Sequence, residues 1–130
     1  MPQTIAPNPP SRLAWVRPAA WLTAAGLLLA PLVAMRFTSE VVWTAGDFAC
    51  AALLLFGPLI AFEVLTRRTA SLGHRIAIAA TLGGAALLTW VNGAVGIIGD
   101  EANPANRIFV AIALAGVAAA VVLAMRAPRR

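Results

Sequence analysis

The sequence predicts an all-α membrane protein, a four-helix transmembrane bundle with both termini cytoplasmic, and three observations lead to this prediction. The 130 residues are 61% hydrophobic and 12% charged, with a mean hydropathy of +0.84, whereas soluble domains carry roughly 25% charged residues. Charged residues divide the chain into four apolar segments, each close to the ~20 residues that cross a bilayer core. The arginines lie mostly in alternate connections, which predicts one fixed orientation.

The chain begins with a proline-rich arm, residues 1–18, which contains Pro2, Pro7, Pro9, Pro10 and Pro18. Proline favours extended backbone, and no pattern of a packed domain is present, so we expect an extended or disordered cytoplasmic arm. The membrane domain follows at residues 19–126, and a basic cytoplasmic tail at residues 127–130. The four spans are expected at about residues 19–36, 44–66, 75–98 and 105–125.

The basic residues set the orientation. The arm, the connection between the second and third spans, and the end of the fourth span with its tail contain Arg12, Arg17, Arg67, Arg68, Arg75, Arg126, Arg129 and Arg130. The two other connections hold only Arg36 and Arg107. Positive charge near span ends is retained on the cytoplasmic side, so the net charge of +5 indicates orientation and not nucleic-acid binding. The absence of Lys indicates a high-GC bacterial genome, and we expect a multi-pass protein of the bacterial inner membrane, N-in and C-in.

The start of the second span contains a capping motif. In "WTAGDF", Thr44 suits the N-cap and Asp47 the reciprocal carboxylate, while Trp43 and Phe48 suit the apolar contact across the cap. The alternative is that Asp47 handles protons or cations. Near the other end of the span, Glu63 is expected to pair with Arg67 one turn later.

The third span combines one amide with many small residues. Asn92 is expected to make an interhelical hydrogen bond, with a substrate or pigment contact as the alternative. Small side chains allow another helix to approach closely, which makes the span a candidate interface. The interface residues are Ala80, Gly83, Gly84, Gly93, Gly96 and Gly99.

The polar stretch "GDEANPAN" is expected to be a tight turn, with Gly99 as the C-cap of the third span. Asn103 and Pro104 suit the N-cap and first position of the fourth span. Turn chemistry does not account for Asp100 and Glu101, which form an outer acidic loop with Glu40. A hard cation needs several converging oxygens, and because spacing does not establish convergence, we predict no metal site.

Catalytic groups are scarce. The only histidine is His74, which is expected in a cytoplasmic loop. The only cysteine is Cys50, which is expected to be a small packing residue within an apolar helix. Zinc sets and Cys/His dyads need more of these residues, and no phosphate-binding glycine motif occurs. We therefore predict that the protein is not an enzyme, and the sequence encodes no cofactor site.

Two elements carry a resemblance to known sequences. "VVWTAGDF" and "WVNGAVGIIGDEANPAN" lie within Phe37–Asn106, and the second is not an effect of composition. This stretch resembles an uncharacterised family of small bacterial multi-span membrane proteins with WTxxDF and WVNGAVGIIGDExNPAN elements. The resemblance implies a bacterial membrane protein and supplies no activity.

Two functional hypotheses follow. The first is a non-enzymatic accessory or assembly subunit of a larger respiratory or photosynthetic complex, which packs against other integral membrane subunits through small-residue faces. The alternative is a small transporter or channel, possible as a homodimer, that uses Asp47 and Asn92 as a polar pair in the outer half of the bundle. Under either hypothesis, Trp43, Trp90 and the glycines of the third span offer a surface for membrane lipid, a quinone or a pigment.

Overall fold

The computed structural model describes residues 11–129 and confirms the all-α fold. Four helices are long and apolar enough to cross a membrane, counting the short 3-10 helix η1 (Pro104–Asn106) as the start of the last. They are α1 (Val16–Phe37), α2 (Ala45–Thr66), α3 (Leu72–Val95) and α4 (Arg107–Arg126).

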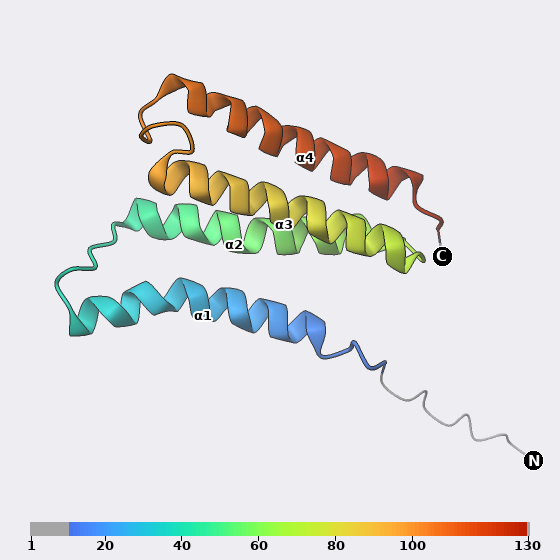
Figure 1. The fold of residues 1–130 in the computed structure, drawn as a ribbon. Helices are drawn as coiled ribbons and strands as arrows, with labels where there is room; N and C mark the ends of the chain where they lie inside the picture. The colour runs from blue at the N-terminus through green and yellow to red at the C-terminus, as the bar shows by residue number, and fades with distance from the viewer. Residues whose placement is uncertain (1–10, 130) are drawn as a thin grey trace, which may run out of the picture.

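The helices run alternately in opposite directions, so the connections gather at two ends of the bundle (Figure 1). The start of α1, the α2–α3 connection and the C-terminal tail lie at one end, which we call the basic end because most arginines lie there. The α1–α2 and α3–α4 connections lie at the opposite end. The tail is not detached: Ala70 N donates to Pro128 O at 3.1 Å, and Thr69 forms an isolated bridge with Arg129.

The first span begins earlier than expected. Of the predicted arm, residues 1–10 lie outside the described residues, and α1 begins at Val16 instead of at residue 19. Pro18 does not prevent this, because it lies in the first turn of α1, where backbone N–H groups have no intrahelical acceptor. The missing N–H of proline therefore removes no helical hydrogen bond. The second span agrees with the prediction to within one residue.

The third span lies three residues closer to the N-terminus than predicted. Ser71 caps its start by accepting from His74 N at 3.4 Å, so His74 lies in the first turn of α3 and not in a loop. At the other end Gly96, with φ 69°, is the C-cap, and the assignment of that role to Gly99 was wrong. A Cβ on Gly96 would overlap the backbone of Asp100, which explains why the chain turns at a glycine here.

The buried core lies where the basic-end halves of α2, α3 and α4 meet. It centres on Ile78, Leu82 and Ala120, and partly buried residues of α2 and α4 pack against it. Small residues bring α3 and α4 together, since a Cβ on Gly116 would meet Ala85 Cβ at 3.5 Å. The helix α1 packs on α2, where the Trp21 and Phe56 rings are 5.7 Å apart.

Little of each span is buried inside the molecule. Only 6% of the most apolar segment of α1 and of α2 is buried, against 17% for α3 and 11% for the last span. Cys50 illustrates this, because it lies in α2 as expected but is exposed and does not pack inside the bundle. Wide apolar faces are therefore left for lipid or for other proteins.

Candidate functional site

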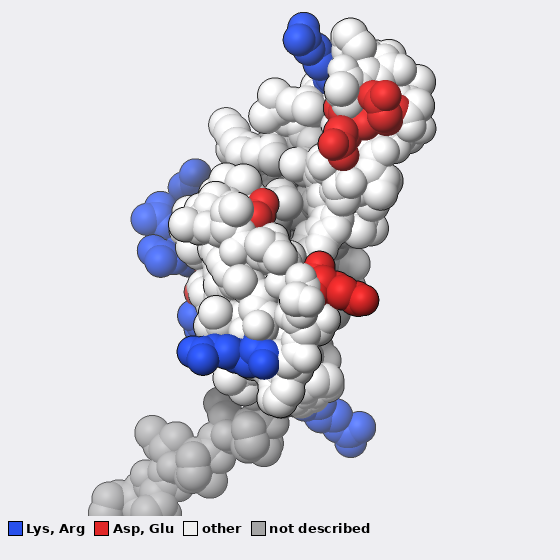
Figure 2. All heavy atoms as spheres, turned by 90° about the vertical axis from the view of Figure 1, so that its left-hand side faces the viewer, with Lys and Arg blue, Asp and Glu red and all other residues white. Residues whose placement is uncertain are grey.

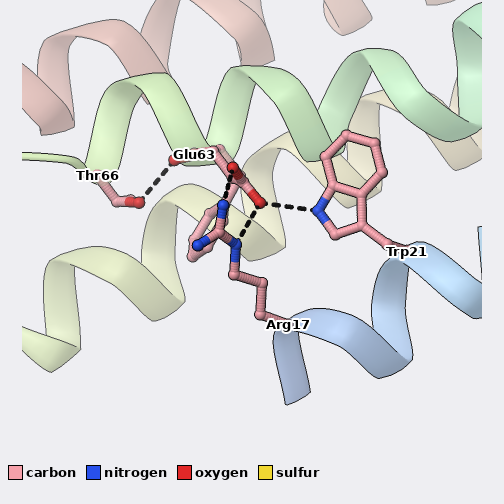
Figure 3. Close-up of polar contacts among 5 residues, drawn as sticks. Arg17, Trp21, Glu63 and Thr66 are labelled. Carbon is pink, nitrogen blue, oxygen red and sulfur yellow. Dashed lines mark hydrogen bonds and ion pairs between the residues drawn. The ribbon is translucent and has the colours of Figure 1, made fainter. Parts of the chain in front are cut away.

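Glu63 is the centre of the most extensive side-chain contact between helices. Arg17 Nε donates to Glu63 Oε1 and Arg17 Nη2 to Glu63 Oε2, both at 2.7 Å, and Trp21 Nε1 donates to Oε1 at 2.7 Å. Arg17 and Trp21 reach from α1 to the same carboxylate on α2 (Figure 3). The forked geometry gives Arg17 two parallel charge-assisted bonds.

The predicted pair between Glu63 and Arg67 was therefore wrong. No hydrogen bond or ion pair joins these two side chains in residues 11–129, and the single ion pair found there is Arg17–Glu63. The carboxylate turns toward α1 because Arg17 and Trp21 lie one turn apart on one face and supply three donors. Sequence reasoning considered only partners on the same helix, although the i,i+4 spacing of Arg17 and Trp21 was visible.

A groove opens beside this contact. It lies between α1 and α3 with α2 as its floor, and its volume is about 760 Å³. Its charged residues are Arg17, Glu63, Arg67 and Arg75, all on the turns nearest the basic end. The rest of the lining is almost entirely apolar and includes Leu59, Phe62, Ala79, Leu82 and Gly83.

The predicted interface residues of α3 fall into two groups. Ala80, Gly83 and Gly84 are exposed, and a Cβ on Gly83, Gly84 or Gly93 would meet nothing within 4 Å. This part of α3 is thus accessible to another helix. Gly96 and Gly99 have φ values of 69° and 73° and belong to the turn that follows.

The capping box at the start of α2 is confirmed. Thr44 N donates to Asp47 Oδ2 at 2.7 Å, and Asp47 N donates to Thr44 Oγ1 at 3.3 Å. Trp43 and Phe48 make the predicted apolar contact, with ring centroids 5.2 Å apart. Asp47 therefore completes a helix terminus.

Asn92 makes the expected interhelical bond. Its Nδ2 donates to Asn106 O, at the start of α4, at 3.3 Å, and its Oδ1 is buried with no partner in the described part of the chain. With α3 at residues 72–95, Asn92 lies about 13 Å from the span centre, near the opposite end of the bundle. No hydrogen bond joins Asn92 to Asp47 among residues 11–129, and each is occupied by a structural contact of its own.

Asn106 was missed by sequence reasoning and organises the polar turn. It is 4% exposed, and its Oδ1 accepts from Ile97 N at 3.1 Å and Ile98 N at 2.8 Å. Its Nδ2 donates to Ile98 O and Asp100 O. Asn103 and Pro104 start η1 as predicted, with Asn103 Oδ1 accepting from Ala105 N at 3.0 Å. The only sequence signal for Asn106 was an additional Asn beside the predicted cap.

The acidic residues of the opposite end do not gather into one site. Glu40, Asp100 and Glu101 are exposed, and Figure 2 shows acidic side chains at separate places on a largely uncharged surface. The expectation that turn chemistry leaves Asp100 without a role was wrong, because Asp100 Oδ1 accepts from Ala102 N at 3.0 Å. Among the described residues, no three His, Cys, Asp or Glu side chains are grouped for a metal ion.

Comparison of the chain with known protein families, with curated proteins and with solved structures finds no match. The family resemblance of Phe37–Asn106 therefore stays a prediction from the two sequence elements.

Proposed function

We propose that the protein is a non-enzymatic accessory or assembly subunit of a larger respiratory or photosynthetic complex in the bacterial inner membrane. The observation that supports this most strongly is the low burial of the spans, at most 17% of the most apolar segment of any one. A bundle that covers so little of its own surface leaves most of each helix for contact with other membrane components.

The exposed part of α3 is the preferred contact surface. In lipid, helices associate by close packing and not by hydrophobic burial, and small residues allow the backbones to approach. Ala80 and Gly84 lie four residues apart on one face of α3, and both are exposed. We assign this pair to the contact with a helix of the partner subunit.

The transporter alternative has less support. A polar pathway needs its groups to face one cavity, and neither Asp47 nor Asn92 lines the groove between α1 and α3. Asp47 is bonded to Thr44, and Asn92 to Asn106.

The test is recovery of partners after gentle solubilisation, measured by mass spectrometry. We expect stoichiometric membrane subunits with the wild type and their loss from an Ala80→Leu, Gly84→Leu variant, because larger side chains hold the partner helix away. Gly26→Leu is the matched control, since Gly26 is exposed on α1 and a Cβ there also meets nothing within 4 Å. Recovery of the wild-type chain alone, as a monomer or homodimer, would contradict the proposal.

A further inference from the structure

The groove between α1 and α3 has all its charged side chains at the basic end, among apolar ones, and is otherwise almost entirely apolar. Its four charged side chains lie near helix ends: Arg17 in the first turn of α1, Arg75 in the first turn of α3, Arg67 at the C-cap of α2, and Glu63 one turn before it. Beyond them the lining contains Leu59, Leu82 and other apolar residues. A ligand that fits has a charged head and an apolar body.

The charged end of the groove carries an excess of positive charge. Three arginines face one carboxylate, so the formal sum is +3 − 1 = +2. Glu63 already accepts three hydrogen bonds from Arg17 and Trp21, which leaves Arg67 and Arg75 without a carboxylate partner in the described residues. Arginine presents a planar fork of donors that matches phosphate.

The position of Arg75 keeps its guanidinium at the groove. Its Cζ lies 5.9 Å from the centre of the Phe62 ring, which is itself part of the lining. No hydrogen bond or ion pair within residues 11–129 occupies the Arg75 guanidinium, so its N–H donors are available to an anion.

The dimensions and depth suit a lipid. The volume of about 760 Å³ lies within the roughly 300–1,000 Å³ of ligand sites. In a bundle that spans a bilayer, the basic ends of α2 and α3 lie at the level of the lipid phosphates. A lipid with its headgroup at this end and an acyl chain along the apolar floor would therefore keep the orientation that it has in the bilayer.

We propose that this groove binds one anionic phospholipid, with the headgroup phosphate at Arg67 and Arg75 and one acyl chain along the floor formed by α2. The Arg17–Glu63 pair acts as a positioning contact, since it fixes the α1 wall of the groove to α2. The site does not depend on the function proposed above, because its residues differ from Ala80 and Gly84.

The charge test titrates the purified, delipidated full chain in detergent with phosphatidylglycerol and, separately, phosphatidylethanolamine, and counts bound lipids by native mass spectrometry. We expect one phosphatidylglycerol, held in preference to phosphatidylethanolamine. An Arg67→Gln, Arg75→Gln variant should bind phosphatidylglycerol at least about tenfold more weakly. Arg68→Gln, Arg126→Gln removes the same charge from the basic end outside this groove and should change affinity less than about twofold.

The shape test leaves every arginine in place. Gly83→Leu projects a side chain from the groove wall, and nothing within 4 Å of the new Cβ opposes it. It should weaken phosphatidylglycerol binding, whereas Gly84→Leu, outside the groove lining, should not. Helical content by circular dichroism establishes that each variant is folded, and Arg75→Gln alone replaces the double variant if that fails.

Any of three binding results would overturn the proposal: equal affinity for the two lipids, equal loss of affinity in the two arginine double variants, or unchanged affinity in Gly83→Leu. Recovery of a quinone with the wild type, in place of a phospholipid, would do the same. If no partner subunits are recovered but the chain still binds phosphatidylglycerol as expected, the result contradicts only the proposed interface and leaves the lipid site unaffected.

Discussion

Asn106 satisfies four backbone groups of the α3–α4 connection with a single buried side chain. Its Oδ1 accepts from the N–H groups of Ile97 and Ile98, which lie just beyond the end of α3 and donate to no backbone carbonyl in the described residues. Its carbonyl oxygen also accepts from Asn92. Asp100, Asn103 and Asn106 in the polar stretch between the last two spans are therefore explained by hydrogen bonding within the turn, with Asn106 as its centre.

Replacing Asn106 with Ala should destabilise this connection by about 3 kcal/mol, because four part-buried hydrogen bonds, each with a net contribution of roughly 0.5–1.5 kcal/mol, are lost. Chemical unfolding in detergent micelles, followed by helical content, measures the change. Asn103→Ala is the control, since Asn103 is only half-buried and caps a short helix with one bond, and it should cost about 1 kcal/mol. Equal effects in the two variants would mean that the Asn106 bonds do not hold the turn.

At the scale of the elements, local motifs correctly predicted two helix starts, at Thr44–Asp47 and at Asn103–Pro104, but the C-cap of α3 was wrongly assigned to Gly99. The Thr44–Asp47 box placed the start of α2 to within one residue, because both partners lie within one turn. The start of α3 could have been placed in the same way from Ser71, and its end from Gly96, but the charge pattern was followed instead. The rest depends on tertiary contacts, as with Glu63, whose partners on α1 are 46 and 42 residues distant.

The attachment of α1 to α2 should depend on the Glu63 carboxylate. Glu63→Gln keeps the shape but removes the negative charge that Arg17 and Trp21 share, so the charge-assisted bonds are lost. We expect a thermal unfolding midpoint several degrees below that of the wild type in detergent.

The control for this variant is Glu40→Gln, which changes an exposed carboxylate. Within residues 11–129, the only hydrogen bond of Glu40 is from its backbone N–H to Thr38 Oγ1. Its midpoint should equal that of the wild type. If Glu63→Gln also equals the wild type, α1 is held by apolar contacts such as Trp21–Phe56 alone.

At the scale of the whole molecule, the four-helix architecture followed from composition and segment length, because a bilayer imposes both. Composition and segment length did not predict which surfaces are buried, because they would equally allow α1 to pack against α3. Its packing on α2 leaves the groove open, and this places the cationic end beside an apolar floor. The candidate lipid site is thus a consequence of helix arrangement that no local pattern encodes.

The orientation of the molecule decides which leaflet supplies that lipid, and the arginine distribution predicts that the basic end is cytoplasmic. In a Cys50→Ala background, Ala70→Cys places a thiol on the exposed α2–α3 connection, and Glu101→Cys places one on the exposed α3–α4 turn. A membrane-impermeant maleimide added to intact cells should label Glu101→Cys, and should label Ala70→Cys only after the cells are opened. The opposite result would put the groove's arginines in the outer leaflet and contradict the positive-inside assignment. Equal labelling of both thiols in intact cells would mean dual insertion, which the strong charge asymmetry opposes and a small homodimeric transporter would permit.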